Sequence, residues 1–157
     1  MKKIFLTIML VAGNILMSYA QRDIQDIILQ FSMQPRVEHI HVGSLAMKLA
    51  QAFASEEDAP FIKGIRSVTV LSLENCDENV KNAFRKQAGN IHENGLELLV
   101  EVTDESDEVR ILAEIRKDMI KRFIVISVGE DPYLIQINGH IDMSYMEELV
   151  SQNTKDI

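Results

Sequence analysis

Four segments in the C-terminal half alternate apolar and polar side chains, and this pattern restricts the fold more than any other feature. They cover residues 96–102, 109–115, 123–128 and 133–141, and short polar turns separate them. Alternation with a period of two is typical of β-strands, and short turns join strands that pair antiparallel. The segment 123–128 is apolar on nearly both faces, which favours a central position. The sequence therefore predicts a four-strand meander.

The N-terminal half adds helices and two more strands. Apolar residues spaced three and four apart predict helices over residues 22–32, from Ser44 to Phe53, and after Asp77, while residues 37–42 and 65–73 read as strands. Helices that come early in the chain would cover one face of the sheet. We expect an α+β fold, a two-layer sandwich with a largely antiparallel sheet.

Two of these segments carry specific expectations about their orientation. In the helix that begins at Ser44, Leu45, Leu49 and Phe53 form one stripe and are expected to face the sheet. In the last strand, Ile135, Ile137, Gly139 and Ile141 line one face, which is expected to point inward, whereas Gln136, Asn138 and His140 are expected to point the other way.

The first twenty residues differ from the rest of the chain. Two lysines precede an apolar run over residues 4–17, and small residues stand one and three positions before Gln21. This is the pattern of a secretory signal peptide, and the run is shorter than the ~20 residues of a membrane helix, which disfavours an uncleaved anchor. We expect cleavage after Ala20, a single domain over residues 21–157 without a transmembrane segment, and a location in the periplasm or cell envelope.

Charge and cysteine content exclude several classes of protein. The chain has 16 basic and 24 acidic side chains, and loss of residues 1–20 would change the net charge from −8 to −10. Such a surface repels phosphate backbones, so no nucleic acid partner is expected. Cys76 is the only cysteine, which rules out an internal disulfide. A small residue at a strand end is the favoured interpretation, and a free thiol or an intermolecular bridge is the alternative.

Several polar residues fall close together in the stretch INGHIDMSYMEEL, Ile137–Leu149. We interpret it as the junction of the last strand with a short helix rather than as a reactive site. Asp142 is expected to cap that helix by accepting the amide hydrogen of Ser144 or Tyr145. Gly139 is expected at a place where a helix or a bulge lies close to the strand.

The other candidate site residues are isolated on predicted strands. His39 and His41 share one face of a strand, with side chains about 7 Å apart. With His140 or an acid they would form a candidate Zn²⁺ or Cu²⁺ site, and a polar outer strand face is the alternative. Arg66, like His140, is a candidate ligand contact, and an ordinary solvated or ion-paired strand position is the alternative.

No familiar catalytic motif is present. The sequence has no G-x-S-x-G, H-E-x-x-H, P-loop or dinucleotide-binding glycine pattern. The acidic turn over residues 103–108 lacks an EF-hand pattern and is expected to keep the surface soluble, with weak Ca²⁺ binding as the alternative. We expect a protein that is not an enzyme and that uses no cofactor.

Four segments, FIKGIRSVTVL, EVRILAEI, RFIVISV and YLIQINGHIDMSYMEEL, occur in this order within residues 24–150. On these segments the chain resembles an uncharacterised family of small exported proteins from Bacteroidota, the domain of unknown function 4252. In that family a Gly-Ile-Arg-Ser strand, a meander and a final Gly-x-Ile-Asp recur. The resemblance implies export to the cell envelope and brings no established activity and no catalytic residues. Because Arg66 matches the family's pattern, it is the first exposed residue to mutate.

These observations favour a non-enzymatic envelope protein that binds another envelope protein, a peptide or a second copy of itself through a face or an edge of its sheet. Met143 and Met146 near the C-terminus suit an adaptable surface, although core packing explains them as well. The second candidate function is a small-ligand or metal carrier that uses the histidines or the arginine named above. A hydrolase with an unrecognised site ranks last.

Overall fold

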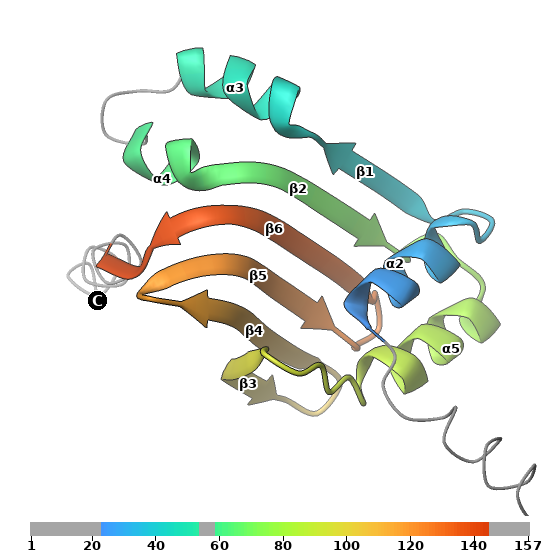
Figure 1. Cartoon of the computed structure of the whole chain (residues 1–157). Helices are drawn as coiled ribbons and strands as arrows, with labels where there is room; N and C mark the ends of the chain where they lie inside the picture. The colour runs from blue at the N-terminus through green and yellow to red at the C-terminus, as the bar shows by residue number, and fades with distance from the viewer. Residues whose placement is uncertain (1–22, 54–58, 145–157) are drawn as a thin grey trace, which may run out of the picture.

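A computed structural model describes residues 23–53 and 59–144 (Figure 1). None of the helices in these ranges is long and apolar enough to cross a membrane. The predicted signal peptide and most of the predicted C-terminal helix, including Met146, lie outside the described residues. In chain order the elements are α2 (Ile24–Ser32), β1 (Glu38–Val42), α3 (Ser44–Phe53), α4 (Ala59–Gly64), β2 (Ile65–Ser72), α5 (Glu78–Ala88), β3 (Glu97–Thr103), β4 (Glu108–Arg116), β5 (Met119–Ser127) and β6 (Tyr133–Asp142).

The strands of the described residues form one antiparallel sheet in the order β1-β2-β6-β5-β4-β3. β3 to β6 make the predicted meander, and β6 also pairs with β2, which joins the two halves of the chain. β5 and β6 are the two middle strands, so the central position predicted for residues 123–128 is confirmed. The predicted α+β class is also confirmed.

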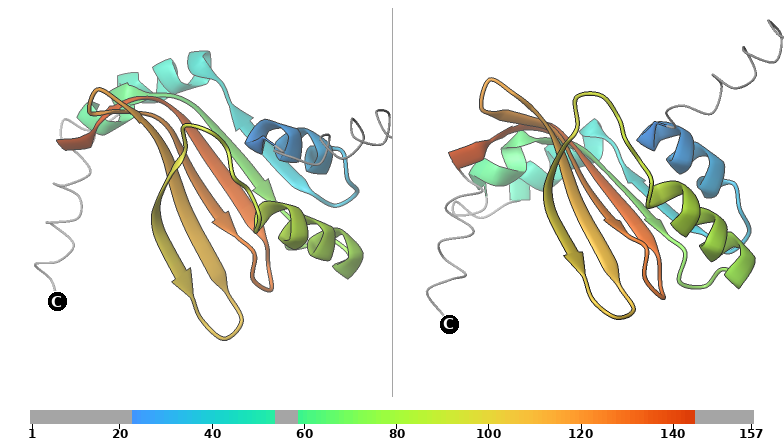
Figure 2. Two further views of the ribbon diagram at one scale, coloured as in Figure 1. Left: turned by 60° about the horizontal axis from the view of Figure 1, so that its bottom comes forward. Right: turned by 90° about the horizontal axis from the view of Figure 1, so that it is seen from below.

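The main core lies between the sheet and the helices α2 and α5, which cover one face (Figures 1 and 2). The four apolar residues that share one face of α2 by their spacing are buried there: Ile24, Ile27, Ile28 and Phe31. Phe31 of α2 meets Phe84 of α5 edge to face, with ring centroids 5.2 Å apart. The sheet contributes Leu71, Ile124 and Leu134, each fully buried. Burial of such side chains is the main source of stability.

The face of β6 that packs against these helices is the opposite of the one expected. Leu134 lies in the α2–α5 core and Gln136 is only 5% exposed, whereas Ile135 is half-buried on the other side of the strand. The expectation is confirmed for Ile141, which is 3% exposed in a smaller cluster that Ile137 also contacts, but it is wrong for Gln136, because a central strand packs on both faces. Alternation then marks the two faces without saying which one meets the helices.

The orientation predicted for α3 is also wrong. Leu45, Leu49 and Phe53 are 75%, 61% and 87% exposed, and Met47 is the buried residue of the helix. Met47 packs in a second, smaller cluster. The apolar spacing identified the helix but not its orientation.

The second cluster lies at one end of the sheet, on the face opposite α2 and α5. It joins Met47 to Ile62 of α4 and to Ile65 and Ile141 of the adjoining strands. Gln51 of α3 fixes the rotation of its helix, because its amide donates to the carbonyl oxygens of Ile62 at 3.1 Å and Ile65 at 3.2 Å. These hydrogen bonds keep the stripe of Leu45, Leu49 and Phe53 on the side of the helix that faces away from the sheet.

Two glycines allow α4 to run directly into β2 beside β6. A Cβ at Gly139 would lie 2.1 Å from the Gly64 carbonyl oxygen, and a Cβ at Gly64 would lie 2.8 Å from the His140 carbonyl oxygen. The neighbouring pairing contains a register shift between Ile65 and Ser67. The expectation that Gly139 marks a close approach of a helix or a bulge is confirmed.

Replacing Gly139 by alanine is expected to destabilise the protein by about 3 kcal/mol, because the new methyl group meets backbone that has to move. The free energy of unfolding from urea denaturation measures this. Gly43→Ala is the control, since its Cβ would have its nearest contact at 3.7 Å. Gly43 precedes α3, so the control is expected to lose at most about 1 kcal/mol. Equal losses in the two variants would contradict the close approach.

Candidate functional site

The face of the sheet away from α2 and α5 carries an apolar row that crosses every strand. Direct cross-strand partners share a face, so the pairing defines the row from edge to edge. None of its members belongs to either core cluster of the described residues. In sheet order the row is Ile40, Val70, Ile135, Val125, Ile111 and Val100. We call it the open-face row.

The open-face row is accessible in the part of the chain that the structure describes. Its end members, Ile40 and Val100, are 55% and 44% exposed, and the four between them are half-buried. Of the described helices, α3 and α4 pack on this side, at the end of the sheet that holds Ile65 and Ile141. The row lies beyond that cluster, so an apolar surface remains uncovered there by the described helices.

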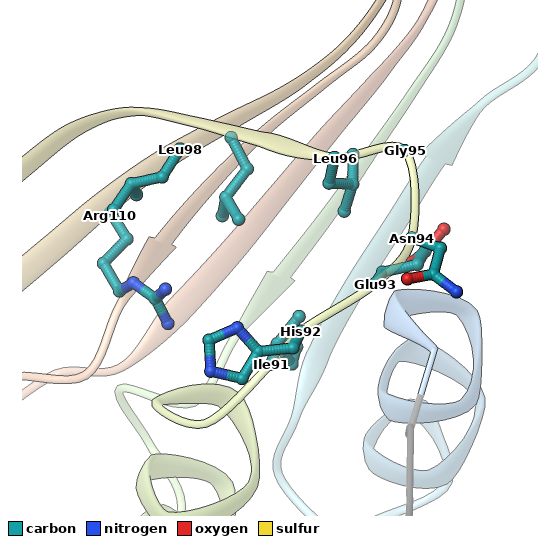
Figure 3. Close-up of a pocket in the computed structure, with 9 residues that line it drawn as sticks. Ile91, His92, Glu93, Asn94, Gly95, Leu96, Leu98 and Arg110 are labelled. Atoms are coloured by element: carbon teal, nitrogen blue, oxygen red, sulfur yellow. The ribbon is translucent and has the colours of Figure 1, made fainter.

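A cavity of about 370 Å³ lies on the opposite side of the sheet, where the loop after α5 meets β3 and β4 (Figure 3). Its apolar walls come from both the loop and the strands, and the Arg110 guanidinium points from β4 toward the His92 ring. It is lined by Ile91, His92, Glu93, Asn94, Gly95, Leu96, Leu98, Arg110 and Leu112. We call it the Arg110 cavity.

The turn after α5 and the pairing of β3 with β4 bring these residues together. α5 ends at Ala88, and the chain then turns into β3 at Gly95, whose φ of 90° favours glycine. β3 pairs with β4 so that Leu98 lies opposite Leu112 and Glu101 opposite Arg110. All four of these strand residues therefore face the side that carries α5.

Arg110 is buried, and its guanidinium N–H groups do not all have hydrogen-bond acceptors among the described residues. Its side chain is 8% exposed, and Nη1 donates to the Gly89 carbonyl oxygen at 2.9 Å. Glu101 Oε1 lies 3.4 Å from Nε, but Nε has no hydrogen-bond acceptor among the described residues. Glu101 is itself 49% exposed, so this ion pair is long and solvated on one side.

Arg122 of β5, by contrast, is surrounded by acids. Its Nε donates to Glu114 at 2.9 Å, its Nη2 donates to Glu93, and Asp23 lies 4.0 Å from Nη1. Glu93 also accepts the amide hydrogen of Ile24 at 3.3 Å. This network ties the loop after α5 to the start of α2 and to the sheet, and it neutralises the Glu93 carboxylate at the edge of the Arg110 cavity.

The metal candidates His39 and His41 share one face of the edge strand β1, as predicted. His41 Nδ1 lies 2.9 Å from Thr69 Oγ1 of the neighbouring strand. The third candidate, His140, is on β6, with β2 between it and β1. Across residues 23–53 and 59–144, no three His, Cys, Asp or Glu side chains are placed to hold a metal ion. Zn²⁺ titration with a His39→Ala control tests this hypothesis.

The two ligand-contact candidates, Arg66 and His140, are exposed and close enough to interact electrostatically. The pKa of His140 lies below its usual value, because partial loss of hydration and the positive charges of Lys121 and Arg66 disfavour its protonated form. The structure thus brings these candidates together with Lys121 in a small basic patch, a neighbour that the sequence patterns did not identify.

Cys76 and Asp142 have structural surroundings. Cys76 is buried in the α2–α5 core, and burial raises the pKa of its thiol, which makes it a poor nucleophile. Asp142 Oδ1 accepts the Ser144 amide hydrogen at 3.0 Å and its hydroxyl hydrogen at 2.8 Å. These hydrogen bonds lower the Asp142 pKa. The predicted capping contact is therefore present.

Sequence reasoning missed Arg110, Arg122 and Glu93. The alternation over residues 109–115 identified the strand, but it led to no expectation about Arg110. Leu112, two positions after Arg110, was the available signal, because residues two apart in a strand share a face. No sequence signal indicates that Glu93, in a loop, would reach Arg122.

The fold and the comparison with known families define the class of protein to which the chain belongs. The architecture is a small α+β domain with one helix-covered and one largely open sheet face. The family model described as "Domain of unknown function (DUF4252)" matches residues 31–149, and the chain belongs to this family. No curated protein and no solved structure matches the chain.

Glu114→Gln is expected to destabilise the protein at pH 7 by about 1–2 kcal/mol, because it removes the charge that faces Arg122. Burial acts to raise the Glu114 pKa, but hydrogen bonds and charge from Arg122 and Arg116 outweigh it and hold the pKa below the ordinary 4.5. A carboxyl group whose pKa is lowered in the folded protein stabilises the fold at pH values above its ordinary pKa. This stabilisation is lost as the pH falls through the pKa of the folded state.

The difference in unfolding free energy between wild type and Glu114→Gln should therefore be full at pH 7 and shrink below about pH 4.5. Urea denaturation of both proteins at several pH values measures it. Glu105→Gln, in an exposed turn, is the matched control and should show almost no difference. A Glu114→Gln difference that stays constant down to acidic pH would contradict the ion-pair assignment.

Proposed function

We propose that the protein is an exported, non-enzymatic interaction module of the cell envelope, and that it associates with a second copy of itself through the open-face row. The observation that carries the proposal is the row, an apolar surface that runs across six strands without a covering helix in the described residues. A flat sheet face packs well against another sheet about 10 Å away.

The distribution of charge favours the open-face row over the rest of the protein surface as the site of self-association. The chain is strongly acidic, and like charges oppose self-association over most of its surface. The open-face row contains no charged residue, and the acids on its side of the sheet include Glu38 and Glu97 on the edge strands. Two copies can therefore meet through the row with their charges at the rim.

The size of the surface indicates a weak dimer. The open-face row has flanking rows on the same face, one of which runs through Ser72, Tyr133, Ser127 and Val109. Two or three rows about 7 Å apart over six strands about 4.8 Å apart give roughly 400–600 Å² per copy. Two copies would then bury roughly 800–1,200 Å², the range of reversible rather than obligate interfaces. We expect a dimer that forms as the protein concentration rises.

The export part of the proposal predicts that the cellular protein begins at Gln21. Intact-mass measurement of protein from the envelope fraction is expected to show loss of residues 1–20. Ala20→Arg, which puts a large charge at the cleavage position, should leave the precursor uncut. A wild-type protein that keeps its first twenty residues would contradict export by cleavage.

The interaction part predicts a sedimentation coefficient that rises with protein concentration and a loss of this rise in Val125→Lys. Val125 is in the middle of the row, where two opposed lysines would repel each other, while in a monomer the lysine can reach water. Sedimentation velocity measures the coefficient.

Leu29→Lys is the matched control, because Leu29 is 61% exposed on α2, on the other side of the sheet. It should dimerise as the wild type does. A wild type that sediments as a monomer at every concentration contradicts the proposal. A Val125→Lys variant that dimerises as before contradicts the assignment to the open-face row.

A further inference from the structure

We propose that the Arg110 cavity binds a small organic carboxylate. In this complex the Arg110 guanidinium holds the carboxylate, and the apolar body of the ligand lies against Leu96, Leu98 and Leu112. The cavity is on the side of the sheet opposite the open-face row, so this proposal does not depend on self-association.

The buried Arg110 guanidinium has hydrogen-bonding capacity that the described residues do not use. A guanidinium has five N–H donors, and in Arg110 Nη1 has an acceptor while Nε is buried without one among the described residues. A buried charge with incomplete partners is unfavourable. Arg122, with carboxylate partners on all sides, shows how the same chain satisfies an arginine that serves structure alone.

The cavity combines apolar and polar lining residues. Leu96, Leu98, Leu112 and Ile91 provide the apolar part of the lining, and His92, Glu93 and Asn94 provide polar groups beside the guanidinium. The cavity of about 370 Å³ is in the lower part of the range for small-molecule sites. A buried cation with leucine side chains on one side favours a ligand with one anionic group and a small apolar body, and His92 and Asn94 leave room for a further polar group on it. Two oxygens of a carboxylate match the fork of a guanidinium better than a neutral carbonyl group does.

Two acids, Glu93 and Glu101, lie near the Arg110 cavity. Glu93 is engaged by Arg122 and by the Ile24 amide, so it leaves little free negative charge toward the cavity. Glu101 is the present counter-ion of Arg110, but its pairing is long at 3.4 Å and its side chain is half exposed. A ligand carboxylate would therefore compete with Glu101 for the guanidinium, and this competition gives the proposal a distinctive test.

The experiment titrates the purified protein with acetate, benzoate and hexanoate, and with hexanamide as the neutral match of hexanoate. Amide shifts in two-dimensional NMR spectra of the ¹⁵N-labelled protein report both affinity and location. At least one carboxylate is expected to bind saturably and to shift residues 91–98 and 110–112. Hexanamide should bind at least about tenfold more weakly than hexanoate.

Two variants and a control separate binding from structure. Arg110→Met, which keeps the length of the side chain, should weaken carboxylate binding by about tenfold or more. Glu101→Gln, on the exposed strand β3, should tighten it, because the competing carboxylate is gone. Arg116→Met should bind as the wild type does, since Arg116 lies on the same strand as Arg110 but is 72% exposed and is absent from the cavity.

Failure to bind any of the three carboxylates saturably up to millimolar concentration would overturn the proposal. So would equal affinity for hexanoate and hexanamide, or shifts confined to residues outside the cavity. If Arg110→Met does not fold, Glu101→Gln decides the question. An unchanged or weakened carboxylate affinity in Glu101→Gln means that Arg110 has only a structural role.

Discussion

The pairing of β6 with both β2 and β5 is the constraint on which the rest of the structure depends. It joins the C-terminal meander to the strands of the N-terminal half, and it needs the close approach of Gly64 and Gly139 where α4 enters the sheet. Because β6 is central, its two faces meet different surroundings. Leu134 closes the core under α2 and α5, while Ile135 belongs to the open-face row.

This division of the sheet separates the two proposed activities. The helix-covered side contains the main core, the Arg122 ion-pair network and the Arg110 cavity, all of which depend on the loop after α5. The opposite side has helices at one end and an apolar strip beyond them. A ligand on one side and a second copy on the other would therefore occupy surfaces that do not overlap.

The sequence predicts the elements of this fold better than their orientation. Period-two alternation identified the meander, and glycine at 139 marked the close approach, because both signals are local. The inward face predicted for α3 was wrong and that predicted for β6 was right only at the end near Ile141, since hydrogen bonds from Gln51 and the position of β6 between two strands are long-range effects. Arg66 and His140 were identifiable from the local strand pattern as exposed polar residues. The cavity around Arg110 was not, because it depends on the long-range pairing of β3 with β4.

Carbene footprinting of aliphatic side chains in dilute and concentrated protein tests the central claim most directly. If one sheet face is open in the monomer and closes against a second copy, Ile135 and Val125 will be labelled in dilute protein and protected in concentrated protein. Leu29 on α2 will be labelled equally in both. Protection of Ile135 and Val125 that is already complete in dilute protein would mean that the chain covers this face itself, and would contradict the account.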